Sequence, residues 1–221
     1  MGEAAELLAS FGHASSVVSS RDGKTLFVGD RDGGIFAIVE VSGESTVLVG
    51  TQTIGVSHLD LDGGSLVLAG TDANGVHGVW TIPVAGGALT EVEAGLAGAP
   101  SGVLALGAGG YIVAHGSGLI ERIGAPGSDA LLDGITVGVP TGMVISADGA
   151  TLMISSLSAR GTAQLVLQPL DGKEATVFDD GIGQNTAAGG LRCTPYGAVC
   201  AWSDSGRRPA GGVYRVTPLN D

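Results

Sequence analysis

The sequence predicts an all-β protein, specifically a β-propeller made of five four-stranded blades. A phrase of two short apolar runs around a tight turn recurs five times, and strand-like segments follow each copy. Helical periodicity is nearly absent along the chain. A repeat of about 40–45 residues with four strands per unit is typical of a propeller blade.

The clearest copy of the phrase is residues 140–155, PTGMVISADGATLMIS. Met143 and Ile145 alternate with other residues before Asp148-Gly149, and Leu152 and Ile154 follow it. Asp-Gly between alternating apolar residues favours a two-residue type I′ turn, in which both central residues have positive φ. This copy is therefore expected to form a strand, a two-residue turn and a second strand.

The other four copies place the turn at corresponding positions. These turns are expected at Asp22-Gly23, Asp62-Gly63, Ala108-Gly109 and Tyr196-Gly197. Counted along the chain with Asp148-Gly149 included, successive turns are 40, 46, 40 and 48 residues apart. Gly, with 40 residues, is far more frequent than usual and falls mainly at turns.

Each hairpin is followed by a third strand and then, in four units, by a fourth strand. The expected third strands are residues 34–38, 78–82, 118–123, 163–167 and 212–216, and the expected fourth strands are 45–49, 89–93, 129–133 and 175–178. The fifth unit has no fourth strand before Asp221. Residues 3–11, EAAELLASF, are predicted to supply it and to close the ring, because an open ring leaves an unpaired strand edge. The alternative is a short N-terminal helix, since Ala, Glu and Leu favour helices.

A single domain over residues 1–221 follows from this repeat. The blades are expected at about residues 13–51, 52–95, 96–134, 135–181 and 182–221.

The charge of the chain argues against two classes of partner. Its net charge is −12, and it contains only two lysines. Nucleic acids require a basic surface, and anionic membrane surfaces also attract basic segments. No apolar run is long enough for a transmembrane helix, and no signal peptide is recognised, so we expect a soluble protein. Export after removal of a signal peptide stays open, as does the compartment.

The two cysteines, Cys193 and Cys200, flank the Tyr196-Gly197 turn symmetrically. A hairpin with a two-residue turn places them opposite each other. They are expected to form either a cross-strand disulfide, if the protein is exported, or a pair of buried thiols. Their spacing is not that of a CxxC metal or redox motif.

The repeat resembles known propeller families. The phrase at residues 140–155 and GGVYRV at residues 211–216 look like the blades of SMP-30/gluconolactonase and strictosidine-synthase-like proteins. Residues 78–92, GVWTIPVAGGALTEV, look more like the TolB type of repeat. The resemblance covers nearly the whole chain, but it specifies fold better than activity. Those families typically have six blades, whereas five are counted here.

The resemblance to SMP-30 implies a divalent metal held by Glu, Asn and Asp at the start of the innermost strands. The matching positions in this chain carry none of these residues; they are Ser15, Gly55, Ser101, Thr141 and Gly189. A hard divalent cation such as calcium needs several oxygen ligands, usually including carboxylates. No cofactor is therefore predicted, and a calcium-like cation belongs only to an alternative with a rearranged metal site.

Candidate ligand-binding residues come from the loops. In propellers the strand 2–3 loops and the loops between blades share one face, and four of the ten basic residues fall in the strand 2–3 loops. That grouping favours an anionic ligand or an acidic partner; the alternative is that the arginines pair with Asp30, Asp32, Asp72 and Asp204. The candidates are Arg31, Asp72, His77, His115, Arg160, Asn185, Asp204, Arg207 and Arg208.

Histidines offer weaker candidates for chemistry. His13, His77 and His115 are expected near the same face, but nothing in their spacing requires zinc. His58 and Asp60 lie on one face of an innermost strand, either as an acid–base pair or as buried hydrogen-bonded groups between blades. No nucleophile elbow, phosphate loop or catalytic carboxylate pair is recognised.

Three functional interpretations remain open. The first is a non-enzymatic propeller that binds a small molecule or a protein on its loop-rich face. The second is an SMP-30-like lactonase with a rearranged divalent-metal site. The third is an engineered or truncated propeller scaffold without native activity.

Overall fold

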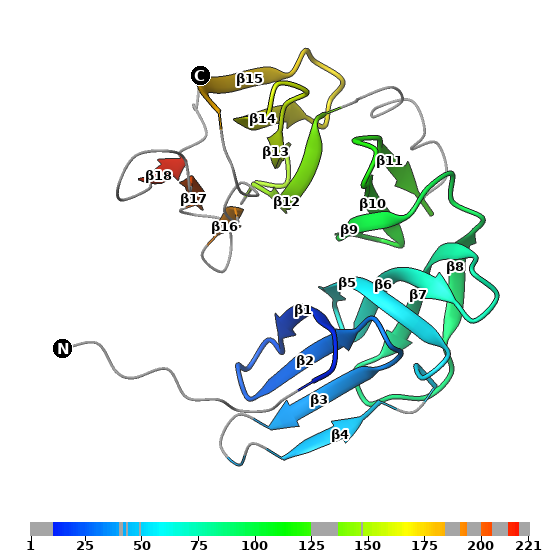
Figure 1. Cartoon of the computed structure of the whole chain (residues 1–221). Helices are drawn as coiled ribbons and strands as arrows, with labels where there is room; N and C mark the ends of the chain where they lie inside the picture. The colour runs from blue at the N-terminus through cyan, green and yellow to red at the C-terminus, as the bar shows by residue number, and fades with distance from the viewer. Residues whose placement is uncertain are drawn as a thin grey trace. The chain divides into compact units, whose positions relative to one another are not determined.

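The computed structural model describes residues 11–39, 42, 44–48, 50–124, 137–146, 148–183, 191–193, 200–204 and 212–216. For 179–183, 192–193, 200–204 and 212–216 only the backbone is described. The regular structure in these ranges is entirely β-strand (Figure 1). The chain divides into two compact units, residues 1–105 and 106–221.

Eighteen strands over the described residues form five sheets, each made of strands consecutive in sequence. Every strand pair with a described register is antiparallel. The strands of the first two sheets are β1 (Ala14–Ser19), β2 (Thr25–Asp30), β3 (Ile35–Val39) and β4 (Ser45–Val47), then β5 (Ile54–Asp62), β6 (Ser65–Asp72), β7 (His77–Pro83) and β8 (Thr90–Ala94). Those of the other three are β9 (Pro100–Gly107), β10 (Gly110–His115) and β11 (Ile120–Ile123), then β12 (Val139–Ile145), β13 (Thr151–Leu157), β14 (Thr162–Pro169) and β15 (Thr176–Gly183), then β16 (Leu191–Cys193), β17 (Cys200–Asp204) and β18 (Gly212–Val216).

These sheets follow the predicted repeat closely, and β15 continues to Gly183, beyond its predicted end at 178. Several predictions lie outside the described residues: the fourth strand at 129–133, the turn at Tyr196-Gly197 and the closing strand at 3–11 up to residue 10. Phe11 is described, and its ring centroid lies 4.9 Å from that of Phe36 in β3. Ring closure therefore stays a prediction, as does the single domain.

Two of the Asp-Gly turns are wider than predicted. The N–H of Ser20 donates to the carbonyl of Thr25, so four residues form the loop, and only Gly23 has positive φ. Asp22 does not need positive φ, because its carboxylate accepts bonds from the Ser20 hydroxyl (2.7 Å) and the Lys24 N–H (3.2 Å). In SADGAT, the described residues 146 and 148–151 make the same bonds, and Asp148 has no positive φ. The type I′ prediction is wrong for these two turns, because the Ser and Asp side chains stabilise a type I-like loop instead.

The remaining two described turns differ from each other. Asp62 pairs with Ser65, so the two-residue loop is Gly63-Gly64, one residue later than predicted, and only Gly63 has positive φ. Between β9 and β10, Ala108 and Gly109 both have positive φ, at 52° and 77°. That pair has the φ signs of a type I′ turn, as predicted.

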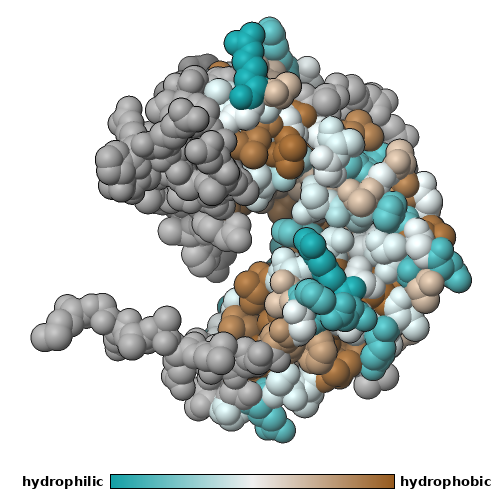
Figure 2. Space-filling view, in the orientation of Figure 1, coloured by the Kyte–Doolittle hydropathy of each residue, from teal (hydrophilic) through white to brown (hydrophobic). Residues whose placement is uncertain are grey.

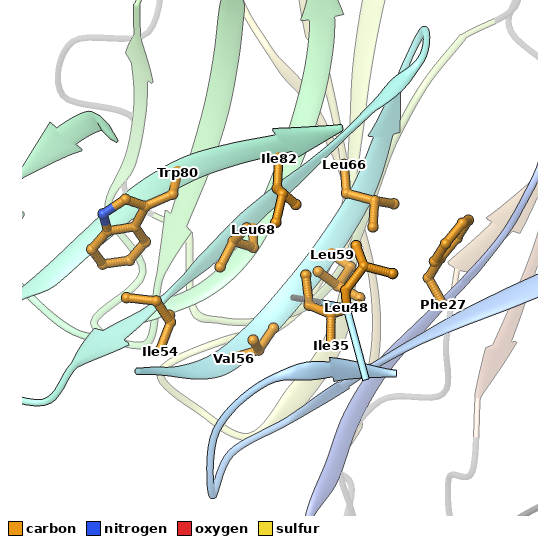
Figure 3. Close-up of a cluster of buried hydrophobic side chains, with 10 residues drawn as sticks. All are labelled: Phe27, Ile35, Leu48, Ile54, Val56, Leu59, Leu66, Leu68, Trp80 and Ile82. Atoms are coloured by element: carbon orange, nitrogen blue, oxygen red, sulfur yellow. The ribbon is translucent and has the colours of Figure 1, made fainter. Parts of the chain in front are cut away.

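A single apolar cluster joins the first two sheets. Figure 3 shows ten buried side chains that converge between them: Phe27, Ile35, Leu48, Ile54, Val56, Leu59, Leu66, Leu68, Trp80 and Ile82. Within the cluster, Trp80 and Ile82 alternate along β7 and Ile54 and Val56 along β5, as the pleat requires, and Leu59 follows a register shift after Val56. In the second unit, Met153, Ala163 and Leu165 pack with Leu191 of β16 in a smaller cluster.

Side chains of the innermost strands bind the backbone of the next innermost strand. The Ser15 hydroxyl in β1 donates to the carbonyl of Val56 in β5 (2.6 Å), and the N–H of Leu59 donates to the Ser16 hydroxyl (3.1 Å). His58 and Asp60 of β5 accept the N–H groups of Val103 (3.3 Å) and Ala105 (2.8 Å) in β9. These bonds connect consecutive sheets through their first strands. One of the two interpretations of His58 and Asp60, as buried hydrogen-bonded groups between blades, predicted this role.

The backbone pairs Cys193 directly with Cys200 across β16 and β17. This register agrees with the symmetric placement of the two residues around the turn. Their side chains lie outside the described part, so the disulfide stays a prediction.

The described surface is mixed in character. Figure 2 shows strongly hydrophilic and apolar residues side by side on the visible face. Large apolar side chains that reach the surface are Val17, Val39, Val47, Val76, Val139, Val177 and Phe178. The part of the chain that the structure describes contains no helix with the length and apolarity needed to cross a membrane.

Candidate functional site

Four loops between second and third strands share one turn frame, defined as residues 30–34, 72–76, 115–119 and 158–162. In each frame the first residue donates its N–H to the carbonyl of the fifth, over 2.8–3.1 Å. The fourth residue is always Gly with positive φ, and its N–H donates to the carbonyl of the first. This is a three-residue hairpin loop in which Gly alone accepts the left-handed conformation without strain.

The first residue of the frame also caps it in three of the four cases. Asp30 accepts the N–H of Asp32, Asp72 accepts those of Asn74 and Val76, and the Ser158 hydroxyl accepts those of Arg160 and Thr162. All eight residues at the second and third positions are exposed: Arg31, Asp32, Ala73, Asn74, Gly116, Ser117, Ala159 and Arg160. The frame therefore fixes the backbone mainly through its first and fourth residues and keeps its second and third positions exposed.

In the first unit, the 30–34 frame meets the end of β6 at Gly55. A Cβ placed on this glycine would lie 2.6 Å from the Arg31 carbonyl oxygen and 3.6 Å from that of Thr71. The N–H of Gly34 also donates to the carbonyl of Ile54, one residue earlier. Only a residue without a side chain allows this approach, so Gly55 holds the 30–34 frame beside the end of β6.

Around this junction the polar side chains are already engaged with one another. His13 Nδ1 lies 2.7 Å from Asp32 Oδ2, and both side chains are exposed. The buried Asp30 carboxylate accepts the His13 N–H. His77 Nδ1 lies 2.9 Å from the Thr71 hydroxyl.

Asp72 is held by its own turn. Its carboxylate accepts the N–H groups of Val76 and Asn74, both at 2.8 Å, and a bond from the Asn74 amide at 3.2 Å. These bonds, led by the one from Val76, lower the pKa of the Asp72 carboxyl. The carboxylate is thus charged and committed to the frame.

In the second unit, two glycines, Gly118 and Gly138, lie at close backbone approaches. A Cβ on Gly138 would overlap the carbonyl of Leu157, and one on Gly118 would clash with the carbonyl of Val137. The N–H of Val137 donates to the carbonyl of Gly118. The 115–119 frame therefore lies beside residues 137–138, which also approach Leu157 and Ser158 at the start of the 158–162 frame.

A groove of about 640 Å³ starts at this second junction and runs along β14 and β15. Its lining residues are Val137, Gly138, Ser158, Ala159, Arg160, Gln164, Val166, Gln168, Ala175 and Val177. Gln164, Val166 and Gln168 share one face of β14 because strand side chains alternate. The volume lies in the range of small-molecule sites, so the groove is a candidate binding surface of this unit.

The groove combines one cationic end with an apolar body. Arg160 is its only charged lining residue, and no ion pair joins Arg160 to a carboxylate among the described side chains. Gln168 donates to the carbonyls of Pro169 and Lys173, which leaves its amide oxygen as an acceptor. The fully buried hydroxyl of Ser156, the cross-strand partner of Gln164, has no hydrogen-bond partner in the described structure.

The predicted candidates fall into three groups. Arg31 and Arg160 are exposed at the free positions of their frames. Asp72 and His77 lie at the second frame of the first unit, bound to neighbours as given above. Asp204 ends β17 opposite Gly212, and only its backbone is described. Asn185, Arg207 and Arg208 lie outside the described residues.

His115, which the sequence analysis expects near the same loop face as His13 and His77, has a buried side chain. Its side chain is only 1 % exposed, and Nε2 lies 2.5 Å from Glu121 Oε1. As the last residue of β10 it turns inward, whereas Asp72 and Ser158 at the same frame position cap their turns. A buried partnered imidazole of this kind does not reach a surface ligand.

The proposed pairing of loop arginines with nearby aspartates is also wrong for the described residues. Asp30 and Asp72 accept backbone N–H groups, and Asp32 pairs with His13. Within these same ranges, no three His, Cys, Asp or Glu side chains gather as a metal site would require. The groove glutamines were missed by the sequence analysis, although two Gln in alternation along an otherwise apolar strand were a usable signal.

Comparison with known proteins identifies the fold but no family. No protein-family model matches the chain, and no curated protein matches it. Among solved structures, YCF48 from Cyanidioschyzon merolae is similar with a TM-score of 0.62 and 12% sequence identity, over 95% of this chain and 68% of that chain. At this identity the likeness bears on fold alone. Together with the consecutive antiparallel sheets, it shows that the chain has the β-propeller fold.

Proposed function

We propose that this chain is a non-enzymatic propeller of five blades, closed by residues 3–11, that binds a ligand or partner through its turn frames. The five described sheets, each consecutive in sequence and matched to one repeat, support the blade count. The bonds from β1 to β5 and from β5 to β9 support a ring assembled through innermost strands.

The observation that carries the binding proposal is the constancy of the turn frame. Four frames use the same bonds and the same Gly, while their second and third positions are exposed and differ in charge and size. Rigid loops that present variable side chains are the usual arrangement of binding surfaces on repeat scaffolds. A frame needed only for stability has no use for this variety.

We infer an acidic partner, or a ligand with an anionic group, from the cations at these positions. Arg31 and Arg160 occupy free positions in different frames, and neither forms an ion pair with a described side chain. Arg207 and Arg208 lie in the corresponding loop of the fifth repeat by sequence, with Asn185 and Asp204 as further candidates. On a chain with net charge −12, unpaired arginines at such positions favour recognition of negative charge.

The test uses a labelled oligoglutamate peptide as probe and fluorescence anisotropy at low and at physiological salt. The variant Arg31→Ala with Arg160→Ala is expected to weaken binding about tenfold, because exposed charge contacts contribute up to ~1 kcal/mol each and fade with salt. Its melting temperature should stay close to that of the wild type, since both side chains are exposed and unpaired.

Arg21→Ala with Lys173→Ala is the matched control. It removes the same total charge from one residue in each unit, but both residues lie in other turns, outside the frames. Equal weakening by the two double variants would reveal a nonspecific charge effect and overturn the proposal. Weakening by the frame variant alone would support it.

The resemblance to SMP-30 suggests a second experiment, which tests the lactonase interpretation. Hydrolysis of gluconolactone by the full chain, abolished by a chelator and restored by calcium or manganese, would replace the non-enzymatic proposal with the lactonase interpretation. A large rise in melting temperature with either ion would point the same way, because a ligand bound only by the folded state stabilises it.

A further inference from the structure

Asn74-Gly75 is the one Asn-Gly pair in the sequence, and it lies in the exposed turn frame 72–76. Asparagine followed by glycine is chemically labile, because a residue without a side chain gives least hindrance to attack by its own backbone nitrogen. The pair therefore carries a reaction that the proposed binding function does not use.

The reaction needs only water. The Gly75 nitrogen attacks Cγ of Asn74, a new C–N bond closes a five-membered succinimide, and the Cγ–Nδ2 bond breaks. The Gly75 proton leaves with the side-chain nitrogen as ammonia. Water then opens the ring at either carbonyl and gives aspartate or isoaspartate, so each event adds one negative charge.

The turn frame restrains both reacting groups. The nucleophilic N–H of Gly75 donates to the carbonyl of Asp72 at 3.0 Å. The leaving amide, Nδ2 of Asn74, donates to Asp72 Oδ2 at 3.2 Å. Asp72 Oδ1 further accepts the N–H groups of Asn74 and Val76, both at 2.8 Å. Ring closure requires the Asn74 side chain to turn towards the Gly75 nitrogen, which breaks at least the first two bonds.

We propose that Asn74 is a site of spontaneous deamidation whose rate is set by Asp72. While the frame is intact, Asp72 holds the amide and the backbone away from each other. When the frame opens, the pair reacts at the rate of an unstructured chain. Asp72 thus acts as a positioning residue that protects its neighbour.

The product cannot restore the frame. An aspartate at position 74 puts a carboxylate where an amide N–H met Asp72 Oδ2, so an attraction becomes a repulsion between like charges. An isoaspartate also lengthens the backbone by one carbon. Deamidation is therefore expected to loosen the 72–76 frame and to add negative charge to its exposed surface.

Two substitutions of Asp72 remove its side-chain hydrogen bonds in steps. Ser158 holds the first position of another frame and caps two backbone N–H groups there, at 3.1 Å each. Asp72→Ser is therefore expected to keep the backbone caps and to lose only the bond to the Asn74 side chain. Asp72→Ala removes all three side-chain bonds.

The experiment follows the mass of the peptide that contains residue 74 during incubation of the full-length protein at mildly alkaline pH. Asp72→Ser should deamidate about fivefold faster than the wild type, the factor that corresponds to one net hydrogen bond of about 1 kcal/mol. Asp72→Ala should be faster still, and the wild type in concentrated urea should be fastest. Asn74→Gln provides the control without a reactive pair, and circular dichroism checks that each variant is folded.

Two results would overturn the proposal. One is an equal rate for the folded and the urea-unfolded wild type, which would mean that the frame gives no protection. The other is a folded Asp72→Ala variant that reacts no faster than the wild type, which would assign protection to something other than Asp72. As an independent readout, Asn74→Asp should exchange the Val76 amide hydrogen faster than the wild type.

Discussion

Oδ2 of Asp60 accepts a hydrogen bond from the backbone N–H of Ala105, with 2.8 Å between the two atoms. This bond fastens the innermost strand of the second sheet to that of the third. It also places a carboxylate in a partly buried position, where desolvation raises the pKa of Asp60 despite its two backbone bonds.

Asp60→Ala is predicted to lower the free energy of unfolding by about 1–3 kcal/mol, because the Ala105 N–H loses its acceptor. The loss should grow as pH falls from neutral towards about 4. Because burial raises the pKa of Asp60 in the folded state, its carboxyl stabilises the fold at pH values below its unfolded pKa. That contribution is lost as the pH rises through the folded pKa. Urea unfolding of both proteins at several pH values measures the difference.

Asp22→Ala is the control for that experiment, because its effect on stability should change with pH in the opposite direction. Hydrogen bonds, first from the Ser20 hydroxyl, lower the pKa of Asp22 in the folded state. Its contribution is therefore present above the unfolded pKa and lost as pH falls. If the effects of the two substitutions changed with pH in the same direction, the assignment of the Asp60 shift to burial would be wrong.

Thr51 provides a second test of the core of the first unit. Its buried hydroxyl accepts the N–H of Ile35 and donates to the carbonyl of Leu48, both at 2.8 Å. Thr51→Val keeps the shape but leaves the Ile35 N–H unpaired, so we predict a loss of about 1–3 kcal/mol in chemical unfolding. Thr51→Ser keeps the hydroxyl and should cost only about 1 kcal/mol for the lost methyl group. A more harmful Ser than Val variant would contradict this role.

Gly55→Ala is predicted to destabilise the first unit by about 1–3 kcal/mol, since the new methyl group would lie 2.6 Å from the Arg31 carbonyl oxygen. Hydrogen exchange should also show faster opening of the 30–34 frame. Gly64→Ala is the matched control, because its Cβ meets open space and its φ is not positive. Equal effects of the two substitutions would refute the packing argument.

Ala108 is the one described non-glycine residue with positive φ. Ala108→Gly relieves the clash of Cβ in this conformation and is predicted to raise the free energy of unfolding by about 0.5–1 kcal/mol. Ala159→Gly, at an exposed position without positive φ, should instead lower it by a similar amount, because glycine loses more freedom on folding. Thermal unfolding measures both variants: the melting temperature should rise for Ala108→Gly and fall for Ala159→Gly.

Much of the fold was accessible from the sequence because strand periodicity is local. The alternation around Asp148-Gly149 places β12 and β13 correctly, and the same phrase places three further hairpins. The turn types were not accessible in the same way. Asp22 and Asp148 follow serines whose hydroxyls bind them, and this bond outweighs the preference of Asp-Gly for a type I′ turn.

The candidate site was predicted less well, because it depends on contacts between segments distant in sequence. Nothing near His115 signals that it turns inward to Glu121, whereas the same position in other frames caps the turn. The roles of Gly55 and Gly138 require knowledge of which carbonyls approach them. The arginines at free frame positions were identified, since exposure of a loop residue follows from the hairpin alone.

Because Asp72 and Ser158 cap the N–H groups of the third and fifth residues in frames of identical length, the pairs of residues between cap and glycine are interchangeable. Residues 73–74 and 159–160 can in principle be exchanged, or randomised together, without redesign of the strands that carry them. The molecule is in this sense a display scaffold, with eight adjustable positions in its described loops whose chemistry can be selected while the backbone stays the same.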